Sequence, residues 1–582
     1  MAALLSGKLP HNFLWGSATG ESRLRVVERV RAFELNTHHF RQRASKLKGP
    51  PRPTAGGKSI WMIFLEFPEK HFDGRNGDDA TDSYKLWRDD ISLLARYGVK
   101  SYCFSLSWSR IIPLGGRNDP INPKGIEFYS IPSTRFWQMA SRPSWSVKLI
   151  SKIVHISPGT LQQTLYHWDL PQGLHDRYGG WLNKDEIMQD YTNYAKVCFE
   201  NFGDRVKFWL TMNEPWCVSI LGYGRGVFAP GRSSDRTRSP EGDSSTEPWV
   251  VGHNVILSHA SAVKLYRDEF KPLQGGQIGI TLNGDWQMPY DDSPESMMGS
   301  SSTRLDFAIG WFADPIYLGH YPPYMQQLLG NRLPQFTPTE LALVKGSSDF
   351  YGMNTYTTNL CRAGGDDEFQ GLVDYTFTRP DGTQLGTQAH CAWLQDYPEG
   401  FRALLNYLWK VSPADIRHGK RVCCQNESDM PKEVAVKDTD RVNYYRGITA
   451  NLQAAIHEDG VDVRAYLAWS LLDNLSGTFA DGYTTRFGVT YVDYNTQERL
   501  PKESAAFIVK WFQDRSQPTE FTPSLKQLMV KASDAISIAS TLSKGDSSLS
   551  AIPVSWFAQL KAWVSRYILA LLSLVKFNVS RR

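Results

Sequence analysis

Cysteine is scarce in this chain, with seven in 582 residues. The cysteines show no Cys-x-x-Cys spacing, and none has histidine partners at the spacing of a zinc site. Two of them, Cys423 and Cys424, are adjacent and cannot readily bridge each other. This usage favours a reduced compartment, and nothing in the sequence indicates a metal or an organic cofactor.

Long apolar runs are also missing. The run from Tyr567 to Val575 is too short to cross a bilayer, so no transmembrane segment is expected. The segment from Met1 to Pro10 contains no basic region followed by an apolar run, which argues against a secretory signal. A cytoplasmic location is therefore expected.

No excess of one charge is present. The net charge is +4, spread without long runs of one sign, so neither nucleic acid nor a membrane surface is implied as a partner. Aromatic residues, in contrast, make up 13% of the chain, with 19 Trp. Their flat faces and polar edges suit sugar rings, although a large core also uses them.

Short apolar runs rich in strand-forming residues alternate with helix-length amphipathic segments. The six clearest runs are SYCFSLSW near Ser101, QTLYHW near Thr164, VKFWLTM near Val206, QIGITLNG near Gln277, SDFYGMN near Ser348 and VRAYLAWS near Val463. This alternation predicts βα units and a parallel sheet. The runs end in polar or aromatic residues, as expected where strands meet the rim of a barrel. Residues 1–516 are predicted to form this domain.

The composition changes from about Gln517. Residues 541–550 are small and polar, and Trp556 to Phe577 is typical of an amphipathic helix. Residues 517–582 are therefore predicted to be an extension made of a linker and a helix. Two interpretations stay open: a loosely attached tail, or a helix that binds a membrane surface or a partner.

One segment, Trp209-Leu-Thr-Met-Asn213-Glu214-Pro-Trp, places a carboxyl group at the end of a buried strand. A carboxyl flanked by an amide and aromatics suits a general acid that protonates a glycosidic oxygen. Asn213 is placed to donate to a sugar hydroxyl beside the cleaved bond. Taken alone, Asn-Glu-Pro is a weak signal, because three-residue strings occur often by chance.

Other motifs accompany it in a fixed order. They are Thr164-Leu-Tyr-His167-Trp168-Asp-Leu-Pro, Asp349-Phe-Tyr-Gly-Met-Asn354-Thr-Tyr356, Ala468-Trp469-Ser-Leu-Leu-Asp-Asn474 and Ala480-Asp-Gly-Tyr483-Thr-Thr-Arg-Phe-Gly. The set resembles family 1 glycoside hydrolases, the fungal-type intracellular β-glucosidases especially, over most of residues 9–515. The resemblance implies a (β/α)8 TIM barrel. It also implies retaining hydrolysis of terminal β-D-glucosyl residues from small β-glucosides or cello-oligosaccharides.

The resemblance also implies roles for individual residues. Glu214 matches the general acid/base, and Asn213 matches the residue that binds the 2-hydroxyl of the sugar. Tyr356 matches the tyrosine that hydrogen-bonds the nucleophile. The other implied substrate contacts are His167, Trp168, Asn354 and the stacking residue Trp469. Without the other motifs, the more probable interpretation of adjacent His167 and Trp168 would be two residues packed in the core.

The nucleophile is absent from the sequence. Retaining hydrolysis needs two carboxylates about 5 Å apart. The family's nucleophile lies in a strand similar to Ile-Tyr-Val-Thr-Glu-Asn-Gly, whereas the corresponding segment, Ser412 to Cys424, has no glutamate. The glutamate is expected near Gly419 and Lys420. Glu427 belongs to the matching segment downstream and is not a substitute.

A shifted reading frame is compatible with this loss. Permitted codons for Ala414 to Cys424, read from the second base, translate as Pro-Ile-Tyr-Val-Thr-Glu-Asn-Gly-Phe-Ala. The glutamate codon then straddles Gly419 and Lys420. A shifted frame from Ser45 likewise permits Gln-Val-Glu-Gly, the family's sugar-binding segment, within an aberrant insert near residues 20–57. Further aberrant segments are expected near residues 131–163 and 411–425.

Two further replacements distinguish this chain from the family's sequence. Leu475 to Phe479 replaces the family's Phe-Glu-Trp and removes the glutamate that binds the distal glucose hydroxyls. Cys103 stands where the family has an arginine beside the nucleophile, and a single base change converts one into the other.

Three hypotheses follow: a working β-glucosidase gene with a flawed translation, a decayed gene, or a pseudoenzyme that binds sugars without cleaving them. The charged segment from Asp415 to Arg421 is expected to be irregular or poorly packed, since unpaired buried charge is costly.

Overall fold

The computed structural model describes residues 7–10, 13–19, 57–64, 80–140, 160–298, 303–411, 416–421, 425–426, 430–474 and 484–516. The chain divides into two compact units, Met1–Thr519 and Glu520–Arg582. All described residues belong to the first unit. The predicted C-terminal extension therefore lies outside the described residues, as does most of the insert near residues 20–57.

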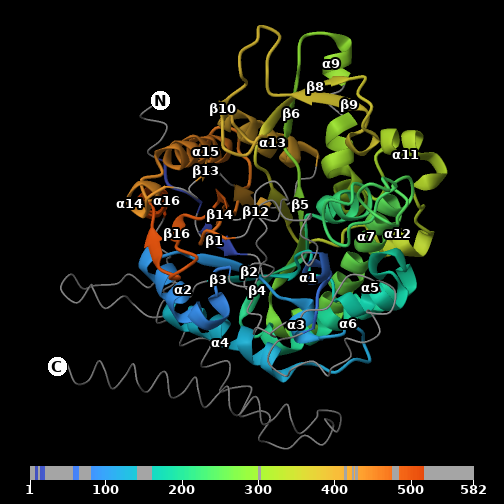
Figure 1. Ribbon diagram of the computed structural model, residues 1–582, viewed down its shortest axis with the longest axis horizontal. Helices are drawn as coiled ribbons and strands as arrows, with labels where there is room; N and C mark the ends of the chain where they lie inside the picture. Colours follow the sequence, from blue (N-terminus) through green and yellow to red (C-terminus); the bar gives the residue numbers. More distant parts are fainter. Residues whose placement is uncertain are drawn as a thin grey trace, which may run out of the picture. The chain divides into compact units, whose positions relative to one another are not determined.

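Eight parallel strands close into a barrel (Figure 1). The strands are β1 (Leu14–Thr19), β2 (Ser101–Ser105), β3 (Thr160–Tyr166), β4 (Val206–Asn213), β5 (Gln277–Asn283), β7 (Tyr351–Asn354), β12 (Ile416–Arg421) and β14 (Ala465–Trp469). They are arranged around the ring in chain order, and β1 closes it by pairing with both β2 and β14. This confirms the predicted (β/α)8 barrel.

The six apolar runs recognised in the sequence all contain barrel strands. In β2 and β14 every residue is buried, because a parallel strand is covered on one face by the barrel interior and on the other by helices. Their continuous apolar character follows from this two-sided burial, so the runs could be recognised without period-two alternation.

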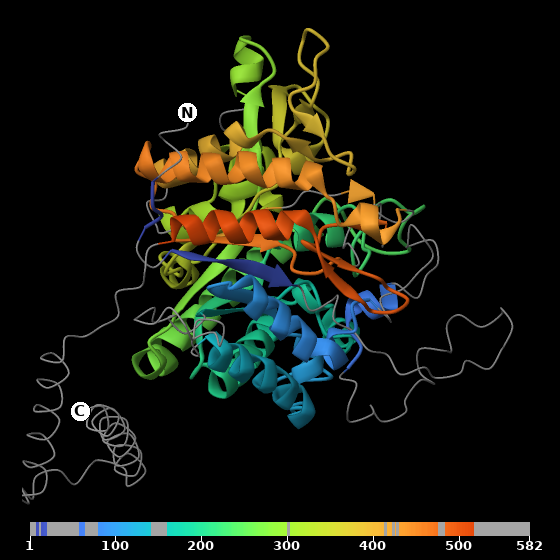
Figure 2. The same ribbon diagram turned by 90° about the vertical axis from the view of Figure 1, so that its left-hand side faces the viewer.

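Helices surround the ring of strands (Figures 1 and 2). The longer helices are α2 (Ser83–Tyr97), α4 (Pro123–Ala140), α6 (Lys184–Phe202), α7 (Glu247–Leu265), α13 (Pro398–Val411), α15 (Thr439–His457) and α16 (Glu503–Arg515). The shorter ones are α1 (Ile60–Phe64), α3 (Trp108–Ile111), α5 (Gln172–Tyr178), α8 (Lys271–Gln274), α9 (Pro294–Met298), α10 (Trp311–Ala313), α11 (Pro323–Leu329), α12 (Pro338–Val344) and α14 (Lys432–Ala435). Helix α6 begins after Asn183 because this residue caps it: the Asn183 side chain accepts a hydrogen bond from the Glu186 backbone N–H at 3.2 Å.

Small sheets lie beside the barrel. One is built from β6 (Trp286–Pro289), β8 (Thr358–Ala363) and β9 (Val373–Thr376) and projects from the barrel near α9 (Figure 1). The other strands form pairs: β10 (Thr387–Gln388) with β11 (Gln395–Asp396), β13 (Gln425–Asn426) with β15 (Thr485–Arg486), and β16 (Thr490–Val492) with β17 (Arg499–Pro501).

The segment after residue 415 corrects one expectation. Ile416–Arg421 is a barrel strand, β12, which pairs in parallel with β7 on one side and β14 on the other. The expected irregularity is limited to a register shift between Ile416 and His418. The ring closes only if a strand fills this place, so the backbone adopts it despite the charged sequence. Asp415 lies outside the described residues.

The expected aberrant segment at residues 131–163 is also partly regular. Helix α4 continues to Ala140 with Pro132 inside it, and β3 already begins at Thr160. Proline is tolerated near a helix start, but in an interior turn it removes a backbone hydrogen bond. Helix α4 therefore continues past Pro132 with a loss of stability. The unusual sequence therefore replaces the family's residues without removing the helix or the strand there.

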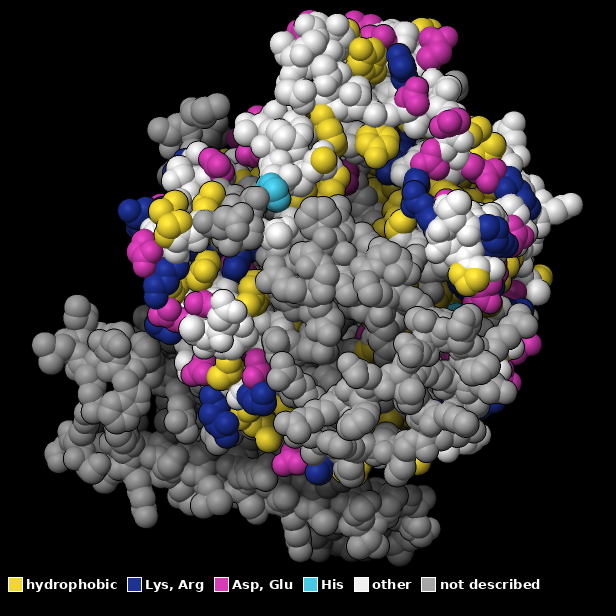
Figure 3. All heavy atoms as spheres, viewed as in Figure 1, with side chains coloured by type: hydrophobic (Ala, Val, Ile, Leu, Met, Phe, Trp, Pro, Cys, Tyr) yellow, Lys and Arg dark blue, Asp and Glu magenta, His cyan; other side chains and the backbone are white. Residues whose placement is uncertain are grey.

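Tryptophan contributes heavily to the core. Among the tryptophans whose burial the structure describes, six are almost fully buried: Trp15, Trp108, Trp181, Trp209, Trp249 and Trp311. The core interpretation of the high aromatic content therefore holds for these six. Figure 3 shows acidic and basic side chains interspersed over the described part of one face, in keeping with the small net charge.

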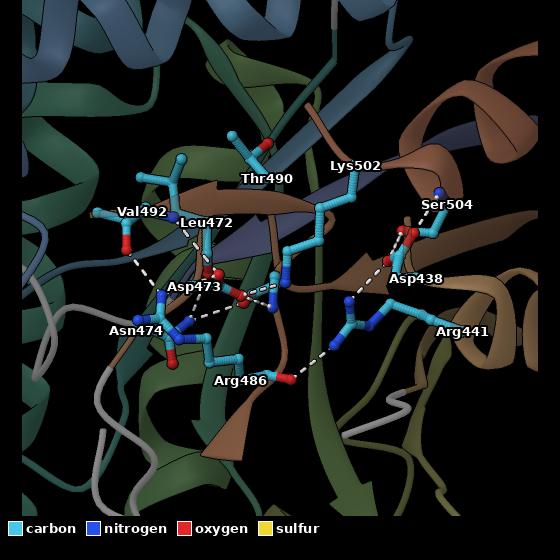
Figure 4. A network of polar contacts seen from close by, with 12 residues as sticks. Asp438, Arg441, Leu472, Asp473, Asn474, Arg486, Thr490, Val492, Lys502 and Ser504 are labelled. Carbon is cyan, nitrogen blue, oxygen red and sulfur yellow. Dashed lines mark hydrogen bonds and ion pairs between the residues drawn. The ribbon is translucent and has the colours of Figure 1, made fainter. Parts of the chain in front are cut away.

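A buried ion network anchors the segment that follows β14 (Figure 4). The Asp473 carboxylate accepts from Lys502 Nζ at 2.9 Å and from Arg486 Nη1 at 3.2 Å, and it also accepts from the backbone N–H of Gly488 at 2.9 Å. The side chains of Asp473 and Lys502 are fully buried. A second buried pair, Arg441 with Asp438, joins the network where Arg441 Nη2 donates to the Arg486 carbonyl.

Removing the charge of Asp473 is expected to destabilise the fold. Asp473→Asn removes the carboxylate that pairs with the buried Lys502 and Arg486, and breaking a buried ion pair costs about 3–5 kcal/mol. The free energy of unfolding, measured by urea denaturation followed by circular dichroism, should fall by about that amount. The exposed Asp292 supplies the control. Asp292→Asn should change the same quantity by less than about 0.5 kcal/mol, and an equal loss in both variants would contradict the account.

The cysteines, the apolar helices and the potential metal ligands can also be compared with the sequence-based expectations. Cys103, Cys198, Cys217 and Cys361 are buried and form no disulfide, whereas Cys391 is disulfide-bonded. Among the described residues, no helix is long and apolar enough to span a bilayer, and no group of three or more potential ligands could hold a metal ion.

Candidate active site

The end of β4 presents the predicted acid/base. Glu214 follows Asn213 directly, is 5% exposed, and its N–H donates to the Thr281 carbonyl of β5 at 2.9 Å. The β4–β5 register shifts just before it, between Leu210 and Asn213. The backbone of Glu214 has φ of +52°, a left-handed conformation that costs a glutamate on the order of 1 kcal/mol. Such conformations cluster at functional sites, and Trp168, just past β3, has φ of +75°.

Three donors surround the Glu214 carboxylate. Asn354 Nδ2 donates to Oε1 at 2.5 Å, and the Tyr356 hydroxyl donates to the same oxygen at 2.6 Å. The Cys217 thiol donates to Oε2 at 3.5 Å. Asn354 and Tyr356 come from the end of β7 and the residues after it, so β4 and β7 together hold the carboxyl in one place.

The Tyr356 hydroxyl has a hydrogen-bond partner other than the nucleophile named by the resemblance. The resemblance implied that its hydroxyl would bind the nucleophile, but the structure gives that hydroxyl to Glu214. The reason lies in the sequence, since the strand that should carry the second carboxylate has none. Burial and the Glu214 charge both raise the pKa of Tyr356 well above its usual value, so the phenol stays protonated and remains a donor near neutral pH.

An aromatic cluster lies at the ends of β3 and β14. The His167 ring is 5.3 Å from Trp168 and 5.9 Å from Trp469, measured between centroids. His167 Nδ1 and Ser105 Oγ are 2.6 Å apart, which fixes the orientation of the imidazole. Trp168 Nε1 donates to the Asn213 carbonyl at 2.9 Å and so joins this cluster to β4.

Asn213 links the cluster to the carboxylate. It is 1% exposed, and its Oδ1 accepts from Asn354 Nδ2 at 3.1 Å, the same group that binds Glu214. The structure therefore brings together every site residue named from the sequence: Glu214, Asn213, Asn354, Tyr356, His167, Trp168 and Trp469. Their roles in binding and catalysis remain proposals.

The place of the missing nucleophile is fixed by backbone register. Gly419 of β12 pairs with Met353 and Lys420 with Asn354, at the same end of the barrel as Glu214. The sequence from Ser412 to Asn426 contains one acidic residue, Asp415, and no glutamate. Glu427 lies outside the described residues. The position expected for the second carboxylate is thus present as backbone and lacks the side chain.

Cys103 replaces an arginine that the resemblance places beside the nucleophile. It lies in β2, is 1% exposed, and its Sγ is 3.8 Å from Thr164 Oγ1. A thiol supplies neither the positive charge nor the forked donors of a guanidinium. This departure therefore removes a second part of the expected nucleophile environment.

Sequence reasoning missed Asp285. Its Oδ1 accepts from the N–H groups of Tyr356 at 2.6 Å and Thr357 at 3.0 Å, and so orients the segment that carries the Tyr356 hydroxyl. The available signal was its position two residues after β5, in the same kind of strand-end location as Glu214.

Comparison with known proteins settles the family. The family model described as Glycosyl hydrolase family 1 matches residues 44–517. The chain belongs to glycosyl hydrolase family 1. Beta-glucosidase 1B of Phanerodontia chrysosporium is 62% identical to this chain over 510 residues, covering 87% of the chain and 86% of that protein. Beta-glucosidase 12 of Oryza sativa subsp. indica is 40% identical over 469 residues, covering 78% of this chain and 87% of that protein.

Solved structures agree with this assignment. A family 1 β-glucosidase from the fungus Humicola insolens, determined in complex with glucose, is 44% identical with a TM-score of 0.78, covering 88% of this chain and all of that one. Membership of glycosyl hydrolase family 1 confirms the resemblance stated from the motifs, and β-glucosidases are prominent among the relatives of this enzyme framework.

Proposed function

We propose that this family 1 chain is a β-glucosidase that acts on the terminal β-D-glucosyl group of small β-glucosides or cello-oligosaccharides. The observation that carries the proposal is the buried Glu214 carboxyl at the end of β4, held by Asn354 and Tyr356 beside the aromatic cluster. No cofactor enters the proposal. The cytoplasmic location expected from the N-terminal segment stays a prediction.

Glu214 acts as the general acid/base in this proposal. In its protonated form it donates to the glycosidic oxygen as the bond to the anomeric carbon breaks, and Asn213 binds the neighbouring sugar hydroxyl. Trp469 and His167 contact the glucose ring, whose apolar face stacks on the indole.

The second half of retaining hydrolysis lacks its carboxylate. The anomeric carbon needs a nucleophile on the face opposite the leaving group, and β12 provides no glutamate there. Turnover by the chain as written should therefore be very slow. A second candidate is a sugar-binding pseudoenzyme. The chain belongs to family 1 and lacks the nucleophile, but it keeps Asn213, Trp168 and Trp469.

Trp469→Ala is expected to weaken sugar binding. Loss of the stacking face should raise the Kd of methyl 1-thio-β-D-glucoside, a glucoside that resists cleavage, by about tenfold. Isothermal titration calorimetry measures this without any turnover. Trp87→Ala, which removes a partly buried tryptophan of α2, is the control and should leave the Kd unchanged. Equal affinity of the wild type and Trp469→Ala would count against the proposed glucose site.

A further inference from the structure

Arg304 has two guanidinium-group nitrogens that are buried without a hydrogen-bond partner. Its guanidinium lies over the ring of Trp216, with Cζ 6.0 Å from the ring centroid. Its Nε and Nη1 atoms are buried and make no hydrogen bond. Because arginine stays protonated in proteins, a buried guanidinium needs an anion nearby to offset the loss of water.

The carboxylates near Arg304, those of Asp285 and Asp367, bind other groups. Asp285 accepts from the N–H groups of Tyr356 and Thr357, and Asp367 forms an ion pair with Arg225. Both raise the pKa of Arg304 only as neighbouring charges, while burial lowers it more strongly. Within the part of the chain that the structure describes, neither forms an ion pair with Arg304.

Further unpartnered atoms lie on the same side of Glu214. The Nδ2 of Asn283 donates to Cys217 Sγ at 3.6 Å, and that thiol in turn contacts Glu214. Asn283 Oδ1, Asn354 Oδ1 and Trp216 Nε1 are buried without a hydrogen-bond partner. Acceptors and donors therefore surround the acid/base on the side formed by β5, β7 and the residues after β4.

This side differs from the one proposed for glucose. The aromatic cluster of His167, Trp168 and Trp469 lies at the ends of β3 and β14. In contrast, Trp216 follows β4, Asn283 ends β5 and Arg304 follows α9. A general acid protonates the oxygen between the two halves of its substrate, so the groups on its other side face the leaving group.

We propose that Arg304, stacked on Trp216, recognises a carboxylate on the aglycone of the β-glucoside. The inference rests on the proposed function, because it takes the aromatic cluster as the glucose site. A guanidinium matches a carboxylate with two parallel N–H donors, and the Trp216 face holds the guanidinium in position for both. The charge of the aglycone then forms an ion pair with Arg304.

Binding of two uncleavable probes tests this inference. The probes are 4-carboxyphenyl 1-thio-β-D-glucoside and its neutral amide, 4-carbamoylphenyl 1-thio-β-D-glucoside, titrated calorimetrically into the full chain. Wild type is expected to bind the carboxylate at least about tenfold more tightly. Arg304→Gln should lower the affinity for the carboxylate alone and bring the ratio close to one.

The control is Arg362→Gln, since Arg362 also lies over an aromatic ring, that of Tyr290, but is exposed and paired with Asp374. It should keep the tenfold ratio. Arg304→Lys keeps the charge and loses the fork, so an intermediate ratio is expected, and this variant serves if Arg304→Gln does not fold. Equal binding of both probes by wild type, or a full ratio in either Arg304 variant, would overturn the role of Arg304 alone. Failure of both probes to bind wild type would overturn the proposed function as well.

Discussion

Replacing residues 414–423 with Pro-Ile-Tyr-Val-Thr-Glu-Asn-Gly-Phe-Ala is expected to raise kcat/KM for an aryl β-glucoside by about 10⁴- to 10⁶-fold, the range lost when a catalytic nucleophile is removed. The replacement puts glutamate at position 419, which pairs with Met353 at the end of the barrel that carries Glu214. There its carboxylate can attack the anomeric carbon while Glu214 protonates the leaving group. The measurement is release of 4-nitrophenol from its β-D-glucoside.

The matched control is the same ten-residue replacement with glutamine in place of the glutamate. It restores the apolar strand without the nucleophile, and so separates better folding from restored chemistry. Activity should stay at the wild-type background in this control. A rise equal to that of the glutamate variant would show that packing, and not the missing carboxylate, limits the wild-type chain.

Glu214→Gln in the glutamate-restored variant should lower kcat/KM for cellobiose by about 10²- to 10⁴-fold, the usual contribution of a general acid. Cellobiose has a poor leaving group that needs the proton. A 2,4-dinitrophenyl β-D-glucoside, whose leaving group needs little protonation, should lose much less in its bond-breaking step. Comparison of the two substrates isolates proton transfer from binding.

Added azide supplies a second readout for Glu214. Once the glycosyl group is on the nucleophile, azide attacks without a general base, so it should speed turnover of the dinitrophenyl substrate only in the Glu214→Gln variant. The exposed Glu295 provides a control, and Glu295→Gln should affect neither substrate. An equal loss for both substrates, with no response to azide, would contradict the acid/base role.

The sequence predicted most of the barrel because its strands are buried on both faces. β2 and β14 appear as uninterrupted apolar runs, and that pattern survives in a single sequence. β12 was not expected as a regular strand, because Ile416–Arg421 is charged. Its place follows from pairing with β7 and β14, which depends on the whole ring and not on local residue preference.

The sequence identified most residues of the candidate site, but it could not predict the contacts between them. Ordered motifs identified Glu214, Asn354 and Tyr356, yet the hydrogen bonds of the last two to Glu214 depend on how β4 and β7 lie side by side around β5. Asp285 and Arg304 were missed for a related reason. Each belongs to no recognised motif, and only its surroundings in the fold distinguish it from other charged residues.

The strand at β12 bears on the origin of the sequence. In β12 a charged segment fills the position of a barrel strand, while the strands on either side, β7 and β14, carry the family's motifs. A shifted reading frame confined to this segment would produce that combination. Cys103 is better explained by ordinary substitution and supports gene decay. Sequencing the spliced transcript across the codons for residues 411–426 distinguishes the two, because a flawed translation predicts Thr-Glu-Asn-Gly in the true product.

The central claim is that this site holds one catalytic carboxylate and no nucleophile. The most direct measurement is intact-protein mass spectrometry after incubation with 2,4-dinitrophenyl 2-deoxy-2-fluoro-β-D-glucoside, which leaves its sugar attached to a glycosidase nucleophile. The wild-type chain should show no added mass, and the glutamate-restored variant should gain one fluoroglucosyl group. Stoichiometric labelling of the wild-type chain, at Glu427 or any other residue, would contradict the claim.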